Sequence, residues 1–358
     1  MYIKTTKEAL LKAVLTAYKA VPSKASAPIM ETLLFSAGDG WFSVNATDGE
    51  ISIMAKASGE ADGSACLSAK TIVELVKVLP SGDVTIEAKE KSATVTWASG
   101  HSEIPTFSPD DFPNIGPSTG DTATFNADEI RTAISHALPH VATDILRPQF
   151  TGVHFRPGKD TTEIVGTDTH TICVFPVKGS VAKEFTVSAK SAAAVRDAAA
   201  EAEAVSVVVC DNRINFVCGD VAISAQVIIG KFPDYNRIIP VGNANVITAD
   251  VRSFSQQLRR VAICSNKASN HIRLDLSASG SSVSAQDLGF GVSAREDLAV
   301  DYEGDDLSIG FKHDLFIKSI CVFDCEKVHV SFSDARHAAL VTSDDDPAKC
   351  VVMPVAIS

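Results

Sequence analysis

The side chains that most often do chemistry are present in this chain, but no catalytic motif assembles them. His313-Asp314 and Asp168-His170 place histidine close to aspartate, which is ordinary in a chain of 358 residues. The sequence contains no Gly-x-Ser-x-Gly nucleophile turn, no Gly-x-x-x-x-Gly-Lys-Ser/Thr phosphate loop and no Gly-x-Gly-x-x-Gly motif. The pattern therefore argues against an enzyme.

The eight cysteines do not form a metal-binding pattern along the sequence. Most lie in apolar runs, as expected for reduced, buried thiols of a cytosolic protein. Cys321 and Cys325 are four residues apart, but no Cys or His pair at zinc-finger spacing supplies further ligands. We therefore expect no metal and no cofactor.

The arrangement of charge suggests a different chemistry, the binding of phosphate groups. The net charge of −12 taken alone argues against nucleic acid. Six predicted helices, given below, nevertheless carry thirteen Lys and Arg against seven Asp and Glu, which leaves −18 for the remainder. A basic helical surface on an acidic body suits a protein that follows a phosphate backbone. The alternative for each helix is that its Lys and Arg simply decorate a solvated face.

Three series of short markers recur about 120 residues apart and show that the chain is built of repeats. Each series is one short motif found three times, and the copies are Thr47-Asp48, Thr167-Asp168 and Gln286-Asp287; Ser68-Ala69-Lys70, Ser188-Ala189-Lys190 and Gly310-Phe311-Lys312; and Phe112-Pro113, Phe232-Pro233 and Met353-Pro354. Because the three series keep the same phase, we predict a triplicated domain with copies at residues 1–118, 119–241 and 242–358.

Each third of the chain shows the same order of elements. Apolar residues at helical spacing predict two helices per repeat, at residues 6–20, 69–79, 127–138, 189–200, 250–263 and 312–323. Short apolar runs separated by turn residues predict about six to eight strands per repeat. Clusters of turn-forming residues at 114–121 and 240–245 predict short linkers. The fold class is therefore α+β, with helices covering one face of an antiparallel sheet.

Three segments resemble one known family. Residues 231–240 (Lys-Phe-Pro-Asp-Tyr-Asn-Arg-Ile-Ile-Pro), residues 166–172 (Gly-Thr-Asp-Thr-His-Thr-Ile) and residues 350–355 (Cys-Val-Val-Met-Pro-Val) look like the bacterial β sliding clamp, the processivity subunit of the replicative DNA polymerase. The resemblance covers essentially the whole chain. It implies three copies of the clamp fold, with two chains joined head to tail in a ring of six domains. It also implies a non-catalytic protein whose helices line a hole around duplex DNA.

The resemblance and the basic helices together suggest a surface that faces DNA without reading its sequence. Lys24 and Arg147 match basic loop positions of the family. The other candidates rest on helix membership, and they are Lys70, Lys77, Arg131, Lys190, Arg196, Arg259, Lys312 and Lys318.

The resemblance further implies a groove between the second and third domains that receives short linear motifs from the polymerase, the clamp loader and repair proteins. Carried over position by position, the groove comprises Phe150, Thr167, Thr169, His170, Thr171, Ile172, Pro233, Arg237, Ile238, Val351, Val352, Met353, Pro354 and Val355. The family often has glycine and arginine where this chain has Thr169 and Thr171, which bears on the loop geometry and the pocket rim. Without the family, His170 is a hydrogen-bonded structural histidine and Met353 is plain core.

The homodimer contacts implied by the resemblance are Ile263 and Cys264, facing the edge strand near Ile104 of the other chain. Both side chains could instead simply end a buried helix. The alternative function is a monomeric protein-binding scaffold that never encircles DNA. No run of 18 apolar residues and no signal-peptide pattern is present, so we expect no membrane partner and a cytoplasmic, nucleoid-associated protein.

Overall fold

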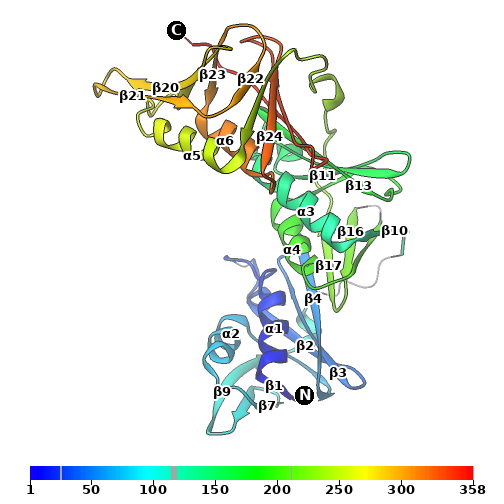
Figure 1. Ribbon diagram of the computed structural model, residues 1–358. Coiled ribbons are helices and arrows are strands. Elements are labelled where there is room, and N and C mark those ends of the chain that lie inside the picture. The colour runs from blue at the N-terminus through cyan, green and yellow to red at the C-terminus, as the bar shows by residue number, and fades with distance from the viewer. Residues whose placement is uncertain (25, 114–118, 211, 358) are drawn as a thin grey trace. The chain divides into compact units, whose positions relative to one another are not determined.

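The same order of elements occurs three times along the chain (Figure 1). The computed structural model describes residues 1–24, 26–113, 119–210 and 212–357. Within them are six α-helices, two in each third: α1 (Lys7–Tyr18), α2 (Ala69–Val78), α3 (Ala127–Ala137), α4 (Ala189–Ala199), α5 (Val251–Ala262) and α6 (His313–Cys321). Each helix lies within one of the ranges predicted from the sequence. The predicted α+β class is confirmed.

In each third one strand precedes the first helix, and the other strands lie between the two helices or after the second. The first third contains β1 (Tyr2–Thr6), β2 (Thr32–Ala37), β3 (Trp41–Thr47), β4 (Ile51–Ser58), β5 (Glu60–Asp62), β6 (Ser64–Ser68), β7 (Asp83–Ala88), β8 (Ser92–Trp97) and β9 (Gly100–Phe107). The middle third contains β10 (Asp121–Asn126), β11 (Gly152–Pro157), β12 (Thr161–Thr167), β13 (Thr171–Lys178), β14 (Phe185–Ser188), β15 (Ala204–Val209), β16 (Arg213–Cys218) and β17 (Val221–Gln226). The last third contains β18 (Asn245–Asp250), β19 (His271–Leu276), β20 (Ser281–Asp287), β21 (Val292–Leu298), β22 (Asp301–Glu303), β23 (Leu307–Lys312), β24 (Lys327–Phe332), β25 (Ala339–Thr342) and β26 (Lys349–Val352).

Side-chain caps explain where several helices begin. The Oγ1 of Thr6 accepts a hydrogen bond from the N–H of Ala9 at 3.3 Å at the start of α1. At the start of α5, the carboxylate of Asp250 accepts one from the N–H of Ser253 at 2.7 Å. Such caps satisfy N–H groups that the first turn of a helix leaves unpaired. A helix therefore follows directly on the strand that opens its repeat.

Neighbouring repeats are joined through their sheets. The β4 strand of the first repeat pairs antiparallel with β17 of the middle repeat, with Ile53 opposite Ile223. The β13 strand of the middle repeat pairs in the same way with β26 of the last, with Ile172 opposite Val351. We call the β4–β17 pair the upstream junction and the β13–β26 pair the downstream junction. In both junctions the strand after the Thr-Asp turn, β4 or β13, pairs with the last strand of the next repeat, β17 or β26. We call this strand the third main strand of its repeat, because it ends the three-stranded run β2–β3–β4 or β11–β12–β13.

The junctions divide the middle repeat between two compact units. The first unit comprises residues 1–131 and 193–227, and the second comprises residues 132–192 and 228–358. A sheet of thirteen strands forms the first unit, and sheets of nine and four strands form the second. Backbone pairing across a repeat boundary is thus as continuous as within a repeat. The first predicted linker lies partly outside the described residues.

The first marker series occupies matching places in all three repeats, and the second does so only in the first two. Thr47, Thr167 and Asp287 each end a strand of a hairpin. Ser68 and Ser188 precede α2 and α4, although the corresponding position before α6 is Lys312. The third series is wrong for the last repeat. Phe232 follows the end of β17 by six residues, whereas Met353 directly follows β26.

Candidate functional site

One tight turn is built in the same way in the first and middle repeats. In the middle repeat the Oγ1 of Thr167 donates to the carbonyl of Thr171 at 2.7 Å, and the Asp168 carboxylate accepts from the N–H of His170 at 3.0 Å. The first repeat has the same bonds, with Thr47 and Asp48 in these places. The residue after the aspartate has a positive φ in both, +92° at Gly49 and +75° at Thr169. Threonine is therefore held in a backbone region that favours glycine.

Asp168 fixes this turn to the last repeat. Its Oδ2 accepts from the Nζ of Lys318 at 2.6 Å, and its Oδ1 accepts from the Oγ1 of Thr171 at 3.0 Å. Burial raises the pKa of Asp168, but the bonds from Lys318 and from the N–H groups of Thr171 and His170 outweigh it, so the pKa lies below its usual value. This pairing corrects the prediction that Lys318 presents its charge to DNA, since that ammonium group is largely enclosed against Asp168.

An apolar cluster covers one face of the downstream junction. It combines side chains of β12, β13 and β26 with those of the segment 231–240: Val165, Ile172, Val174, Phe232, Tyr235, Ala338 and Val351, with Phe150, Ile239 and Leu340 packed against them. We call these ten residues the junction patch. Three of them, Phe150, Ile172 and Val351, are among the predicted groove residues. The patch brings together segments from the middle and last repeats within the second unit.

Two aromatic side chains hold the segment 231–240 on this face. Phe232 stacks on His154 with ring centroids 4.0 Å apart, and Tyr235 is 1% exposed. The hydroxyl of Tyr235 donates to Glu163, and the Arg156 guanidinium lies over its ring. Burial lowers the pKa of His154 to about 4, so the stacked imidazole is neutral. The Phe-Pro-Asp-Tyr run thus acts as an anchor for the rim of the patch.

Exposed groove candidates lie around this buried patch. Met353 is 39% exposed and Ile238 is 47% exposed, and these are the largest apolar side chains on the rim. Thr169, His170, Pro233 and Arg237 are also exposed, and Pro354 and Val355 are partly so. The rim therefore offers apolar contact next to polar groups, and Thr167 lies buried beneath it.

Two predicted groove residues lie on the opposite face of the sheet. Successive residues of a strand alternate between faces. Ile172 and its partner Val351 contribute to the patch, so Thr171 and its partner Val352 point away from it. Both are buried, and the Oγ1 of Thr171 lies 3.0 Å from the Nδ1 of His140. The prediction of direct groove contact by the Thr171 and Val352 side chains is corrected accordingly.

The upstream junction has the same register but polar side chains at four matching strand positions. Ser52 pairs with Ser224 as Ile172 pairs with Val351. Polar side chains occupy the positions that match Val165, Ile172, Leu340 and Val351, and they are Asn45, Ser52, Asn215 and Ser224. A hollow of about 730 Å³ lies over this face in the first unit. At the downstream junction the matching strand positions are apolar instead, as suits a surface that binds aliphatic or aromatic peptide anchors.

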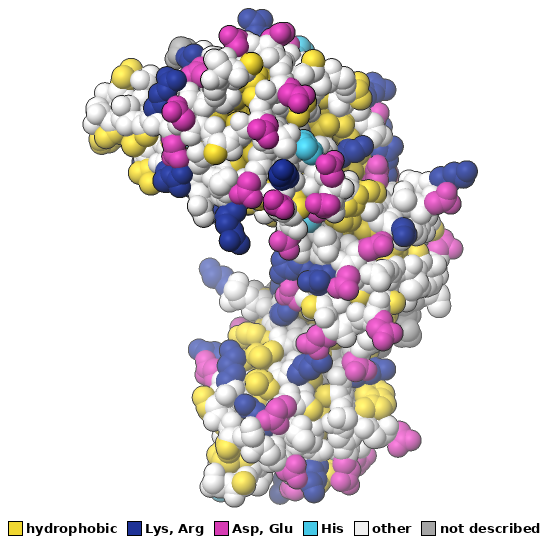
Figure 2. Space-filling model, viewed as in Figure 1, with side chains coloured by type: hydrophobic (Ala, Val, Ile, Leu, Met, Phe, Trp, Pro, Cys, Tyr) yellow, Lys and Arg dark blue, Asp and Glu magenta, His cyan; other side chains and the backbone are white. Residues whose placement is uncertain are grey.

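Four of the predicted DNA-facing side chains carry exposed charge. Among the described residues, no carboxylate lies within ion-pair distance of Lys24, Lys70, Lys77 or Arg147. Lys190 is exposed and Lys312 is partly exposed. Figure 2 shows Lys and Arg side chains interleaved with Asp and Glu over the helix-bearing side of the first unit.

Other predicted DNA contacts have partners of their own. Arg131 lies 3.0 Å from the Asp128 carboxylate, and Arg196 lies 2.7 Å from that of Asp197. A guanidinium nitrogen of Arg259 is 3.4 Å from the Sγ of Cys321. Surface ion pairs like those of Arg131 and Arg196 contribute about 0–1 kcal/mol, so they hold a charge only weakly. These three residues remain weaker candidates than the four unpaired ones.

The proposed dimer residues differ in exposure. Ile263 is 73% exposed and Cys264 is partly exposed, whereas Ile104 is 1% exposed. The Ile104 side chain is therefore part of its own core, and only the backbone of its strand is available. The sequence prediction missed Leu288 and Phe290, which are 84% and 80% exposed beside β21. Figure 2 shows hydrophobic side chains at the tip of this hairpin.

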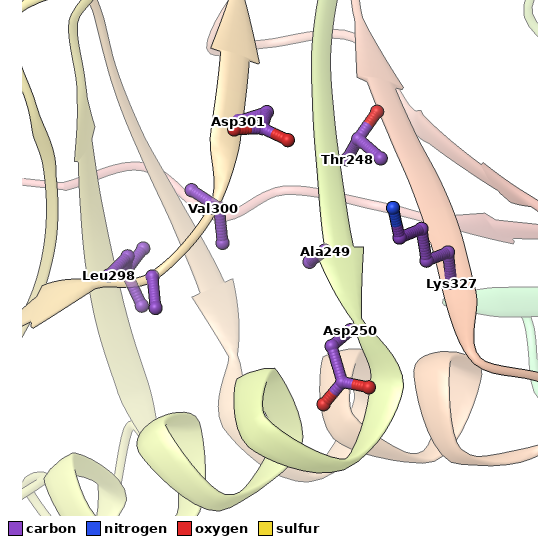
Figure 3. A pocket seen from close by; sticks show the side chains of 8 residues that line it. Thr248, Ala249, Asp250, Leu298, Val300, Asp301 and Lys327 are labelled. Atoms are coloured by element: carbon purple, nitrogen blue, oxygen red, sulfur yellow. The ribbon is translucent and has the colours of Figure 1, made fainter.

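A separate hollow of about 340 Å³ lies in the last repeat between β18, the residues before β22, and Lys327 (Figure 3). Its polar groups serve the fold. Asp250 caps α5, and Thr248 bonds to the Nδ1 of His329 at 3.0 Å. It is not part of the junction patch.

One cluster of buried side chains cannot be recognised from residue spacing along the sequence. His140, Cys173 and Cys350 meet on the helix-covered face of the downstream junction, where all three are buried. They come from three distant segments, so no spacing rule for metal ligands detects them. The expectation of no metal rested on those rules alone.

Comparison with known proteins identifies the family. Three models of DNA polymerase III beta subunit domains match this chain: the N-terminal domain over residues 1–116, the central domain over 124–234 and the C-terminal domain over 236–356. The chain is 25% identical to a beta sliding clamp of Pseudomonas putida and 27% identical to one of Caulobacter vibrioides, each over the full length of both chains.

Solved structures agree on the fold. A sliding clamp from Pseudomonas aeruginosa bound to griselimycin superposes with a TM-score of 0.95 at 24% identity, over the whole of both chains. A DNA polymerase III beta subunit from Thermotoga maritima gives 0.92 at 21% identity, again over both whole chains. No described helix is long and apolar enough to cross a membrane. With three matched domains in the expected order, the chain belongs to the DNA polymerase III beta subunit family.

Proposed function

We propose that this chain is a DNA sliding clamp. Two copies close head to tail into a ring of six similar domains around duplex DNA. The ring is not an enzyme. It tethers the replicative polymerase, and it binds the clamp loader and repair proteins through the junction patch. The protein then works in the cytoplasm, on the nucleoid.

The observation that carries this proposal is a pair of unused sheet edges. The third main strand of one repeat pairs with the final strand of the next at both junctions. By the same rule β21 and β9 are left over. β21 is the end strand of its four-stranded sheet, and among the described residues β8 is the only pairing partner of residues 100–105 of β9. Exposed edges invite pairing, and a two-fold pair of chains satisfies both.

The two internal junctions also predict the register of the seam between chains. Asp48 and Asp287 occupy matching turns, so Val292 corresponds to Ile51. β9 and β17 follow equivalent two-residue turns, so Ile104 corresponds to Ala225, the partner of Ile51. The proposed seam therefore pairs Val292 with Ile104 of the other chain. In that arrangement the exposed Leu288 and Phe290 lie at the end of the paired edge.

Binding to DNA in this proposal depends on scattered cations. Lys24, Lys70, Lys77 and Arg147 are exposed, and no carboxylate of the described residues lies at ion-pair distance from them. Contacts from such groups to phosphates carry no sequence information. Attachment is then weak at any one position and sensitive to salt. The ring stays on DNA because it is closed, and it slides because no base is read.

The test compares retention on circular and linear DNA. We expect a dimer of about twice 37.8 kDa, loaded by the clamp loader onto nicked circles and released when the circle is cut. A stable monomer whose retention is the same on both DNAs would overturn the ring. That outcome would favour a monomeric scaffold that uses the junction patch alone.

Client binding is tested separately at the rim of the patch. Met353→Glu places a charge among apolar contacts, and we expect at least ~10-fold weaker binding of polymerase, since losing one buried apolar anchor costs about 1.5–3 kcal/mol. Val217→Glu is the matched control, because Val217 is 40% exposed and lies at the upstream junction. Equal binding by both variants would contradict the assignment of the patch.

A further inference from the structure

Two thiols face each other across the downstream junction. Cys173 on β13 is directly opposite Cys350 on β26. The N–H of Met353 donates to the carbonyl of His170, so the His170–Met353 pair, three register positions from the two cysteines, is hydrogen-bonded. Because bonded and non-bonded pairs alternate along antiparallel strands, Cys173 and Cys350 form a non-bonded pair, with Cα atoms about 4.5 Å apart. Side chains approach each other most closely at such positions.

A histidine directs one ring nitrogen at these thiols. The Nε2 of His140 is 4.0 Å from the Sγ of Cys350, and the three ligand atoms all lie within 4.8 Å of one another. Metal–sulfur bonds of ~2.3 Å around a shared centre would space the ligand atoms by roughly 4 Å. Only a small contraction of the observed cluster is needed to reach that spacing.

The hydrogen bonds behind His140 set its tautomer. Thr171 donates its single hydroxyl proton to Asp168, so its Oγ1 accepts from the Nδ1–H of His140. The lone pair is therefore on Nε2, which points toward the sulfur atoms. Lys318 holds Asp168 from the other side. Metal-binding histidines are oriented in this way by partners of their second nitrogen.

The upstream junction provides an internal comparison. Ile53 and Ile223 occupy the register positions of Cys173 and Cys350. Thr6 and Asn126 both directly precede the first helix of a repeat, and counting the same number of residues from each places Ala20 at the position of His140. All three are buried. An apolar trio thus suffices to close a junction of this fold, and packing alone does not require sulfur and imidazole at the downstream one.

We propose that His140, Cys173 and Cys350 bind one thiophilic d¹⁰ metal ion, Zn²⁺ or Cu⁺, through Nε2 and two thiolates. Binding replaces the two S–H bonds by two metal–sulfur bonds and releases two protons to solvent. With Zn²⁺ the site is neutral, which suits a buried position. With Cu⁺ the site keeps one negative charge, but three ligands complete its coordination. The site is independent of ring formation and of client binding.

The experiment uses the full-length protein, reduced and stripped of metal under anaerobic conditions. ZnCl₂ and acetonitrile-stabilised Cu⁺ are titrated separately against chromogenic chelators, and Co²⁺ serves as an optical probe of thiolate ligation. We expect one tightly bound equivalent per chain for Zn²⁺ or Cu⁺, a thiolate-to-Co²⁺ absorption band, and a higher unfolding temperature with the bound ion.

The decisive variant copies the upstream trio, as His140→Ala with Cys173→Ile and Cys350→Ile. It should remain folded and lose the tight equivalent, with affinity reduced at least ~100-fold, as losing a second-shell partner alone costs 10–100-fold. Should the larger isoleucines disturb folding, Cys173→Ala with Cys350→Ala gives the same comparison. Cys66→Ala and Cys218→Ala remove buried thiols elsewhere and should change nothing.

Two results would overturn the site. One is a reduced wild-type protein that binds neither ion more tightly than the trio variant. The other is a Cys173–Cys350 disulfide that forms in air while the reduced protein remains metal-free, which would make the pair a redox couple. Dimerisation and DNA retention measured in parallel would show whether the clamp function itself is intact.

Discussion

Thr169 is a residue whose backbone conflicts with its type. Its φ of +75° matches that of Gly49 in the equivalent turn, and a β-branched residue in this region costs about 1–2 kcal/mol. We predict that Thr169→Gly increases the free energy of unfolding by up to about 1 kcal/mol, because relief of strain exceeds the added flexibility of the unfolded chain. Urea denaturation measures the change.

Gly49→Thr is the reciprocal control for that substitution. It introduces the same conflict into the first unit, where we expect a loss of about 1–2 kcal/mol. If Thr169→Gly instead destabilises the protein as much as Gly49→Thr does, the turn is held by contacts of the Thr169 side chain and the strain argument fails.

His154 makes the stability of the second unit sensitive to acid. Its folded pKa of about 4 lies below the unfolded value near 6.5, so the unfolded state binds more protons between these values. The contribution is fully present above pH 6.5 and is lost as the pH falls toward 4, at about 1.4 kcal/mol per pH unit. His154→Gln should flatten this slope, as measured by denaturation at several pH values. The exposed His170→Gln should leave it unchanged, and an equal slope in all three proteins would contradict the prediction.

Sequence reasoning succeeded for single residues where the surrounding pattern was local. The Thr-Asp turns were found because one hairpin sets their hydrogen bonds. It failed where strand alternation or distant partners decide the outcome. Matching residues position by position puts Thr171 and Val352 in the groove without regard to the face they occupy. Helix membership alone assigns Lys318 to DNA, although Asp168 holds its ammonium group. Met353-Pro354 and Phe232-Pro233 are similar in residue type but occupy different places in the fold.

At the scale of elements, the helices and hairpins were predictable because apolar spacing and turn residues specify them locally. The junctions were not, since nothing in a strand's own sequence says which distant strand it pairs with. The same limitation hid the cluster of His140, Cys173 and Cys350, which depends on the β13–β26 register. The difference between apolar and polar side chains at matching positions of the two junctions also became visible only once both registers were known.

The proposed register of the seam predicts which residues of β9 and β21 face each other. Ala294 and Ser102 occupy the places of Cys173 and Cys350 in the downstream junction, a non-bonded pair. Ala294→Cys with Ser102→Cys should therefore form disulfides between chains on mild oxidation, because Cα atoms about 4.5 Å apart lie within disulfide range. Non-reducing electrophoresis detects the covalent dimer.

Each single cysteine variant measures how much cross-linking the native cysteines cause in that assay. Ser293→Cys with Ser102→Cys shifts the pair by one residue and turns the two thiols to opposite faces. It should cross-link at least ~10-fold more slowly. Equal cross-linking by the two pairs would show that the register is different.

For the assembled ring, a substitution at Ile263 tests ring closure without affecting the folding of the chain. It is 73% exposed and follows α5, so Ile263→Arg should leave the unfolding free energy within about 0.5 kcal/mol of wild type, as surface changes usually do. We expect the variant to be largely monomeric by sedimentation and to be lost from circular DNA. Lys267→Ala, a change at a nearby exposed residue, should remain dimeric. A dimeric Ile263→Arg protein would place the seam elsewhere.

The two internal junctions differ from the proposed seam in effective concentration. A strand pair within one chain is closed by a tether, so its partners meet at an effective concentration in the millimolar range. The β9 and β21 edges must instead meet at the cellular concentration of the chain, with no tether on the first contact. Once one seam has formed, the second closes as an intramolecular event. Similar strand pairing therefore gives permanent joints inside the chain and a joint at the seam that a loader can separate without unfolding any domain.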